Sequence, residues 1–295
     1  MTPLRALLER WPGALLMGIL NRTPDSFSDG GRWLDDDVAL ARAEAMTRAG
    51  AAVIDVGAES TRPGAPAISA REQVTRLGGV IRVLSDRTLV SIDTTLPEVA
   101  ERALRDGARV INSVSLAPAA ELGALAKAHG AALVLMHSRG PMEAMAGFSA
   151  GADDAYADVI ADVAREWRAA AEAALAAGLP REDLVLDPGL GFHKNARQSL
   201  EICARLDELA ALGFPVLVGP SRKSFVTRVA GDEPPAPPDR RLGGSLAATI
   251  ACVARGAAIV RTHDVAETRQ ALAVAAALSS FSRRERGKEV TWATS

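Results

Sequence analysis

The sequence predicts an α/β protein whose parallel strands close into a single eight-stranded (β/α)₈ barrel, with an active site at the C-terminal ends of the strands. Eight short apolar runs rich in Val, Ile and Leu recur along the 295 residues. Such near-continuous hydrophobicity is typical of strands that are buried on both faces, as in parallel sheets. Longer segments with helical spacing separate the runs, and this alternation predicts βαβ units.

The eight predicted strands can be read directly from the chain. In order they are ALLMGILN, AAVIDVGAE, LVSIDT, ARVINSVS, AALVLMH, LVLDPG, FPVLVGPS and AAIVRTH. Segments rich in Ala, Arg, Glu and Leu lie between them and predict helices, the clearest at residues 36–50, 69–84, 97–106, 154–177 and 265–279. Two inserts, 138–152 and 231–240, interrupt the alternation, and the prolines of the second predict an irregular loop.

An open, doubly wound sheet is the alternative architecture. It would ordinarily place a glycine-rich phosphate turn, GxGxxG, after its first strand. The segment NRTPDSFSDGG that follows the first predicted strand has no such pattern, and the count of eight strands favours closure. We therefore predict one barrel domain, residues 1–283, and a loose charged tail, residues 284–295.

Composition narrows the classes of function. The chain is 48% hydrophobic and 24% charged, and its net charge of −2 leaves no basic surplus for binding nucleic acid. No apolar run approaches the ~20 residues that a membrane span needs. The only cysteines, Cys203 and Cys252, lack a CxxC spacing and are interpreted as buried, inert thiols. We expect a cytoplasmic protein without membrane or nucleic-acid partners.

Polar residues end all eight predicted strands. In order these are Asn21; Glu59 with Ser60, Thr61 and Arg62; Asp93; Asn112; His137; Asp187; Ser221 with Arg222 and Lys223; and Arg261 with His263. Each alone has an ordinary structural explanation, such as a helix cap or a solvated charge. Because parallel strands bring their C-terminal ends to one face of a barrel, the eight together predict a single polar pocket.

The residue types indicate what the pocket could bind. Asp93, Asp187 and Asn112 can pair with the amidine-like edge of a flat heterocycle, as a carboxylate pairs with guanidinium. A cationic set opposite them suits a phosphate or pyrophosphate; its members are Arg62, Arg222, Lys223, Arg261 and His263. Asn21 and the carboxylates of the first loop offer oxygen ligands for Mg²⁺. Phe27 and Phe192 supply apolar faces for a second ring.

Nine segments, in this order, resemble the motif series of the dihydropteroate synthase family. They read MGILNRTPDSFSDGG, DVGAESTRPGA, SIDTT, VINSVS, LMHSRG, LDPGLGF, VGPSRKSF, RLGGSLA and IVRTHDV, and span about Met17 to Ala271. The resemblance implies a pterin-binding TIM barrel. It also implies an enzyme that condenses 6-hydroxymethyl-7,8-dihydropterin diphosphate with p-aminobenzoate, giving 7,8-dihydropteroate and pyrophosphate on the folate pathway.

The resemblance implies roles for individual residues of this chain. Asp93, Asn112, Asp187 and Lys223 would hold the pterin, and Asp93, Lys223 and Arg261 would be catalytic. Pyrophosphate would lie against Arg62, Arg261, His263 and Asn21, with Asn21 also reaching Mg²⁺. The aminobenzoate site would consist of Phe27, Thr61, Pro63, Phe192 and Ser221. The first two loops would close over magnesium pyrophosphate, sulfonamides would compete with p-aminobenzoate, and the enzyme would be a homodimer through its outer helices.

Three residues depart clearly from the family pattern, and Ser138 and Ala58 are milder changes. Arg22 stands where a small apolar residue is usual, and we weigh an added loop cation equally against a solvated side chain. Ser113 replaces the usual Asp after Asn112, which leaves Asn112 itself in place. His193 stands where Gly is common and is expected to narrow the aminobenzoate mouth and alter sulfonamide affinity.

Two other functions remain open at this point. A pterin-dependent methyltransferase would share the barrel, but it has no use for a pyrophosphate clamp built from STRPG, SRK and RTH. A catalytically degenerate pterin-binding barrel would be expected to lack Asp93, Lys223 or Arg261, all of which are present. No Ser-His-Asp or Cys-His arrangement suggests a covalent intermediate, so the expected chemistry is dissociative substitution, with Asp93 stabilising the pterin cation.

Overall fold

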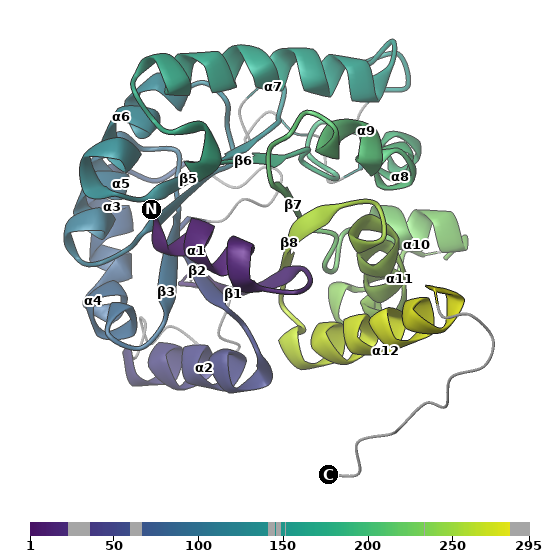
Figure 1. The fold of residues 1–295 in the computed structure, drawn as a ribbon, viewed down its shortest axis with the longest axis horizontal. Helices are drawn as coiled ribbons and strands as arrows, with labels where there is room; N and C mark the ends of the chain where they lie inside the picture. Colours follow the sequence, from purple (N-terminus) through teal and green to yellow (C-terminus); the bar gives the residue numbers. More distant parts are fainter. Residues whose placement is uncertain are drawn as a thin grey trace.

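Eight parallel strands close into a barrel in chain order, with β8 pairing back onto β1 (Figure 1). The structure is a computed structural model that describes residues 1–22, 36–59, 67–140, 145, 149–150, 152–232 and 234–283. The closed barrel confirms the predicted fold and removes the open-sheet alternative. The predicted tail, residues 284–295, lies outside the described residues, so the division into barrel and tail stays a prediction.

All eight predicted strands are present. They are β1 (Leu15–Asn21), β2 (Val53–Gly57), β3 (Leu89–Asp93), β4 (Val110–Ser113), β5 (Ala132–Met136), β6 (Leu184–Asp187), β7 (Val216–Val218) and β8 (Ala257–Thr262). Their residues are almost entirely buried because side chains fill the barrel on one face and helices cover the other.

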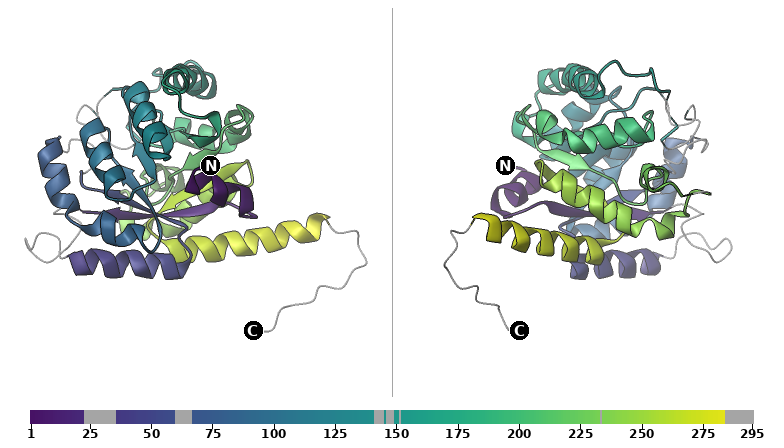
Figure 2. Two further views of the ribbon diagram at one scale, coloured as in Figure 1. Left: turned by 60° about the vertical axis from the view of Figure 1, so that its left-hand side comes forward. Right: turned by 90° about the vertical axis from the view of Figure 1, so that its right-hand side faces the viewer.

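Helices surround the strands, as the two side views also show (Figure 2). The α-helices after β1 to β4 are α2 (Asp36–Ala49), α3 (Ala70–Leu77), α4 (Val80–Ser85), α5 (Pro97–Arg105) and α6 (Ala119–His129). Those after β5 to β8 are α7 (Val159–Ala176), α8 (Ala196–Ala204), α9 (Leu206–Ala210), α10 (Phe225–Ala230), α11 (Leu242–Val253) and α12 (Val265–Arg283). Two short 3₁₀ helices, η3 (Arg181–Asp183) and η4 (Pro238–Arg240), complete the set; η4 lies in the predicted proline-rich loop.

The predicted helix at 69–84 is two helices. Gly78 ends α3 with a φ of 55° and a ψ of −138°, a positive-φ conformation that glycine adopts without steric cost. The other four predicted helical segments correspond to α2, α5, α7 and α12, within a few residues at each end.

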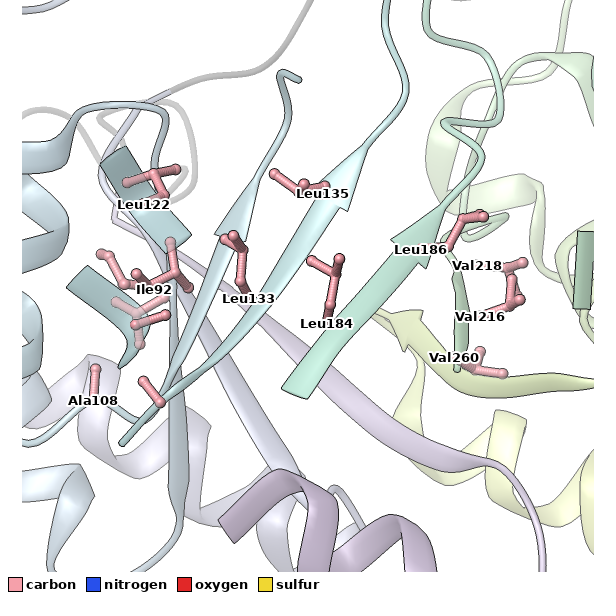
Figure 3. Packing of buried hydrophobic residues seen from close by; sticks show 14 of the residues in the cluster. Ile92, Ala108, Leu122, Leu133, Leu135, Leu184, Leu186, Val216, Val218 and Val260 are labelled. Atoms are coloured by element: carbon pink, nitrogen blue, oxygen red, sulfur yellow. The ribbon is translucent and has the colours of Figure 1, made fainter. Parts of the chain in front are cut away.

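The main core lies between the barrel and its helices. Alternate strand residues such as Ile92, Leu133 and Leu184 point outward into it (Figure 3). Trp167 of α7 is fully buried there; its Nε1 donates to the Leu135 carbonyl at 2.9 Å and its ring meets Phe214 edge-on. Burying the indole with its N–H satisfied gains apolar contact without leaving a polar group unpaired.

A helix that was not predicted closes the N-terminal end of the barrel. In α1 (Pro3–Arg10), Leu4 joins the inward residues from the start of the strands in a second apolar cluster. The buried Thr2 hydroxyl donates to Asp183 Oδ1 at 2.6 Å and accepts from the Arg5 amide as the N-cap of α1. This end of the barrel is therefore a packed core, and the opposite end is left for the site.

Two predictions based on apolar composition can be checked. Both cysteines are buried, Cys203 in α8 and Cys252 in α11. Among the helices that the structure describes, none combines the length and the apolar character needed to cross a bilayer.

Candidate active site

The inward side chains change from apolar to polar along each strand, which builds the site. Residues two apart face the same side of a strand. Inward Val53, Val110, Val185 and Ile259 belong to the apolar cluster at the N-terminal end. Two residues further along each of these strands stand the polar residues Asp55, Asn112, Asp187 and Arg261. The strand period therefore carries these four groups, together with Asp93 on β3, into the C-terminal half of the barrel.

An ion-pair network across four strands forms the floor of the site. Arg261 donates through Nε to Asp55 Oδ2 and through an Nη to Asp93 Oδ2, both at 2.7 Å. Asp55 Oδ2 also accepts from Asn112 Nδ2 at 3.0 Å. Arg261 was predicted to stand opposite the carboxylates with the other cations; in the structure it is bonded directly to them.

The sequence reading missed Asp55, which is fully buried. It lies two residues before the end of β2, and the reading considered only strand ends. A signal was available in AAVIDVGAE, because a carboxylate in the middle of a doubly buried strand must face a polar interior.

Burial and neighbouring charges shift the pKa values of this cluster. Burial raises the pKa of Asp93 to about 7; Arg261 opposes the shift, whereas Asp55, Glu59 and Asp187 add to it. Burial likewise raises the pKa of Asp187, against the Gly189 amide and the Lys223 ammonium. Carboxylates whose pKa values are raised by burial and by specific charged neighbours are typical of functional sites.

The loop between β6 and α8 forms one wall of the site. Gly189 donates its amide hydrogen to Asp187 Oδ1 at 2.7 Å. Lys223 Nζ donates to the Leu190 carbonyl at 2.6 Å and lies 3.7 Å from the centroid of the Phe192 ring. Burial lowers the pKa of Lys223 to about 7, although Asp187 favours its charged form. Phe192 packs in a small apolar cluster with three residues that the sequence reading did not select, Val114, Met136 and Met145.

Ser221 and His263 lie together on the β8 side. The Ser221 hydroxyl oxygen accepts from the His263 amide at 3.2 Å and lies 3.0 Å from His263 Nδ1. Burial, with the positive charges of Arg261 and Arg222, lowers the pKa of His263 to about 3, so its imidazole is neutral at neutral pH. Arg222, predicted as part of the cationic set, is engaged by Asp264 at 2.5 Å.

Two polar strand-end residues support the structure around the site. Glu59 accepts from the Ile68 amide and from Gln73, each at 3.0 Å. His137 is fully buried, and its ring contacts Glu166 and Lys194.

The donor set around Asn21 is compatible with Mg²⁺ but incomplete by itself. A Cβ built on Gly57 would lie 3.7 Å from Asn21 Oδ1 and 3.6 Å from Asp93 Oδ2, so two oxygens border the space that this glycine leaves. Within the described residues, no group of three His, Cys, Asp or Glu side chains could hold a metal ion. An ion at Asn21 would thus need oxygens from a substrate or water, as Mg²⁺ commonly does.

Four predicted site residues lie outside the described residues. They are Phe27, Thr61, Arg62 and Pro63. The first-loop carboxylates, in 23–35, lie outside them as well. The structure therefore places the predicted pterin residues, together with Arg261, His263, Asn21, Phe192 and Ser221, and leaves the rest as predictions.

The three departures from the family pattern can each be described. The solvated reading of Arg22 was wrong, because the side chain is buried and donates to the Arg76 carbonyl and to Asp36 Oδ1, each at 2.6 Å. Its reading as an added cation of the first loop stays a prediction, since residues 23–35 lie outside the described residues. Ser113 donates to the Ser115 carbonyl at 2.8 Å. His193 has a φ of 49°, and its Nδ1 lies 3.1 Å from the Ser138 hydroxyl.

A barrel that gathers carboxylates, an amide and a lysine at one end is suited to a polar heterocycle, and the comparisons agree with this. The model of the pterin binding enzyme family matches residues 17–263. The dihydropteroate synthase of Synechocystis sp. is 42% identical over 266 residues, which cover 89% of each chain.

Solved structures extend the comparison to the fold. The Xanthomonas albilineans dihydropteroate synthase with 4-aminobenzoic acid is 36% identical, with a TM-score of 0.82 over 91% of this chain and 94% of that one. The Yersinia pestis dihydropteroate synthase with a sulfonamide drug complex is 37% identical, with a TM-score of 0.82 over 91% and 95%. The chain belongs to the dihydropteroate synthase family of pterin-binding enzymes.

Proposed function

We propose that this chain is a transferase that joins 6-hydroxymethyl-7,8-dihydropterin diphosphate to p-aminobenzoate, releasing pyrophosphate. The observation that carries the proposal is the convergence of Asp93, Asn112, Asp187 and Lys223 on the C-terminal end of the barrel. Two carboxylates, an amide and an ammonium can pair with the acceptors and donors along a pterin edge.

The pyrophosphate would lie near Arg261 and His263. A neutral His263 can serve as a hydrogen-bond donor there, and its neighbour decides which nitrogen carries the proton. Because the Ser221 oxygen accepts from the His263 amide, its O–H is available to donate to Nδ1, 3.0 Å away. This assignment leaves the proton on Nε2, which would donate to a phosphate oxygen.

The proposed reaction is a substitution at the pterin methylene. The bond from the methylene carbon to the bridging oxygen breaks, and its electrons leave with pyrophosphate. The Asp93 carboxylate stabilises the positive charge that develops on the pterin, because a fixed anion acts where charge appears. The arylamine nitrogen then bonds to the methylene carbon and releases a proton. Mg²⁺ held at Asn21 would neutralise charge on the leaving group.

The second substrate would lie between the β6–α8 loop and the β7 end, against Phe192 and Ser221. The two solved relatives described above, one with 4-aminobenzoic acid and one with a sulfonamide drug complex, support this class of ligand. We propose that sulfonamides compete for the same site. The predicted contacts of Phe27, Thr61 and Pro63 complete this proposal.

One incubation tests the reaction. The purified protein is mixed with the pterin diphosphate, Mg²⁺ and p-aminobenzoate; dihydropteroate is followed by mass and pyrophosphate release in parallel, with each component omitted in turn. We expect both products only in the complete mixture. Pterin binding without turnover would instead support a degenerate barrel, and absence of pterin binding would refute the assignment.

We further propose a cytoplasmic homodimer. Val274 and Leu278 on α12 are large, exposed apolar residues one turn apart, and such a stripe suits a protein interface. Light scattering should give twice the mass of the chain, and Leu278→Glu should shift the protein toward monomer. A monomeric wild type at micromolar concentration would exclude the dimer. Cell fractionation tests the location.

A further inference from the structure

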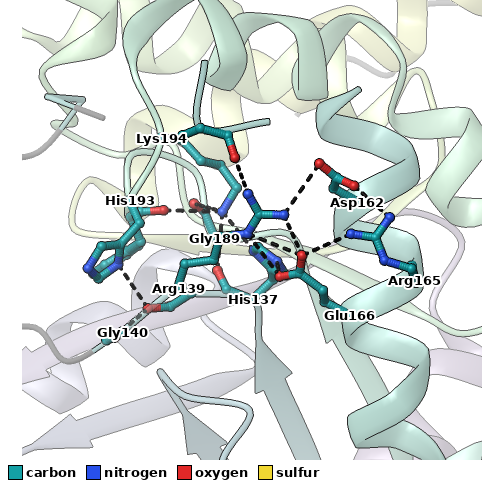
Figure 4. Close-up of polar contacts among 12 residues, drawn as sticks. His137, Arg139, Gly140, Asp162, Arg165, Glu166, Gly189, His193 and Lys194 are labelled. Carbon is teal, nitrogen blue, oxygen red and sulfur yellow. Dashed lines mark hydrogen bonds and ion pairs between the residues drawn. The ribbon is translucent and has the colours of Figure 1, made fainter. Parts of the chain in front are cut away.

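Lys194 is a fully buried lysine that takes no part in the proposed reaction. Its Nζ lies close to four acceptors (Figure 4). It donates to the carbonyls of Gly189, at 3.1 Å, and of Phe192 and His137, both at 3.2 Å. It also lies 3.0 Å from His137 Nδ1. An ammonium in such a place acts as a three-way hydrogen-bond donor rather than as a surface charge.

These contacts tie the β6–α8 loop to the end of β5. Gly189 and Phe192 belong to the loop, whereas His137 directly follows β5. The loop backbone has positive φ at Gly189, Gly191 and His193, so it cannot pair its carbonyls as a helix or strand would. A buried carbonyl without a donor is costly, and the ammonium donates to two from the loop at once. The Gly189 carbonyl also accepts from the Phe192 amide at 3.1 Å, so the Phe192 carbonyl depends more on Lys194.

The surrounding charges keep His137 in the form that accepts from Lys194. Glu166 is held by Arg139, and hydrogen bonds from Arg139 and His137 lower its pKa to about 2. His137 Nε2 lies 2.9 Å from Glu166 Oε2, and burial lowers the pKa of the imidazole to about 3. A neutral imidazole beside a carboxylate carries its proton on Nε2. Nδ1 then carries a lone pair that faces the ammonium. Each hydrogen bond of the network Arg139–Glu166–His137–Lys194 therefore has one donor and one acceptor.

The same loop carries three contacts to the site. Its Gly189 amide donates to Asp187, its Leu190 carbonyl accepts from Lys223, and its Phe192 ring lies against the Lys223 ammonium. A change at Lys194 would therefore reach the site through the loop backbone, without Lys194 touching a ligand.

We propose that Lys194 is a positioning residue that holds the β6–α8 loop so that Phe192, packed against the Lys223 ammonium, forms the aminobenzoate side of the site. The inference rests on the proposed function. It predicts that losing the Lys194 hydrogen bonds weakens aminobenzoate binding more than it slows the chemical step.

Burial also lowers the pKa of Lys194 far enough for the lysine to lose its proton near neutral pH. It lowers the pKa of this lysine to about 7; Lys223 and Arg139 add to the shift, and Asp187 and Glu166 oppose it. The Tyr156 ring lies 5.7 Å away, and its hydroxyl is neutral because burial raises its pKa to about 12. Above neutral pH the amine would keep two N–H donors for four acceptors. Lys223 has a similar pKa and would titrate in the same pH range. The effect of Lys194 on KM is therefore obtained by comparing the pH dependence of KM in wild type with that in the variant.

The test compares Lys194→Met with Lys194→Gln, using Lys127→Met on the exposed face of α6 as the control. Methionine keeps the length and removes every donor, whereas glutamine keeps two N–H groups. We expect the KM for p-aminobenzoate to rise about ten- to a hundredfold in Lys194→Met, the range that one charged hydrogen bond controls. Glutamine should recover part of this loss, kcat should change less than fivefold in both, and the control should match wild type.

Each result has one meaning. The rise of KM with pH should be flatter in Lys194→Met than in wild type. If both variants keep the wild-type KM and only the fraction of active protein falls, Lys194 stabilises the fold without positioning the loop, and the proposal is wrong. If Lys194→Met does not fold, the glutamine variant decides, because an unchanged KM there also overturns the proposal. An inactive wild type would count against the proposed function instead.

Discussion

Replacing Asp55 by Asn should lower stability and shift the pH dependence of activity. The carboxylate is fully buried and accepts from Arg261 at 2.7 Å and from Asn112 at 3.0 Å. Removing one partner of a buried ion pair costs about 3–5 kcal/mol. Since Arg261 keeps its bond to Asp93, we expect a value near the lower end, about 3 kcal/mol.

The loss should be visible by calorimetry. Unfolding entropies near 2.1 cal/mol/K per residue convert about 3 kcal/mol into a Tm decrease of roughly 5 °C for a chain of this length. The same substitution removes a negative charge that raises the pKa of Asp93. If turnover requires ionised Asp93, the acid limb of kcat/KM should move to lower pH.

The dependence of folding stability on pH gives a second test of the same substitution. Because folding raises the pKa of Asp93, the folded chain holds this proton more tightly, and the group's contribution to stability falls as pH rises from 3.8 to about 7. In Asp55→Asn this decline should be smaller.

Asp183→Asn is the matched control, since Asp183 is a buried carboxylate at the other end of the barrel. It should reduce stability without moving the acid limb. An Asp55→Asn protein with wild-type Tm and an unmoved limb would refute the reasoning.

Three other substitutions separate chemistry from support. Asp93→Asn should lower kcat by about 10²–10³ while pterin binding persists, as measured by turnover and calorimetric titration; near-wild-type turnover would exclude Asp93 as the group that stabilises the cation. Gly189→Ala should lose at least about 2 kcal/mol in chemical denaturation, because it has a φ of 68° and a new Cβ would lie 2.1 Å from the His137 carbonyl oxygen; unchanged stability would mean that the loop can move. Leu4→Ala should cost about 2–5 kcal/mol with kcat of the folded enzyme unchanged, and altered kcat at equal folded fraction would show that the two ends of the barrel are coupled.

The strands were predictable because a buried parallel sheet demands continuous apolar sequence. The polar strand ends followed for the same reason, since Asp93, Asn112 and Asp187 interrupt runs that are otherwise hydrophobic. Helix α1 could also have been predicted, from Thr2 as N-cap and Pro3 at the first helical position. It was missed because it is short and an apolar strand follows it closely in the sequence.

The contacts within the site were less accessible. Arg22 is buried because it reaches the Arg76 carbonyl, 54 residues away, and its own neighbours in the chain do not reveal that. The bonds of Lys194 depend on a loop whose φ angles place its carbonyls inward. Asp55 was within reach of the strand period, and only the choice to look at strand ends excluded it.

The two buried thiols make the chain convenient for spectroscopy. Since Cys203 and Cys252 are its only cysteines and both are buried, a maleimide dye should not react with the folded protein. A single cysteine at exposed Arg71 on α3 would then take one fluorophore at a known place. Ligand titrations could be followed by its emission, without a radioactive substrate and without first removing any native residue.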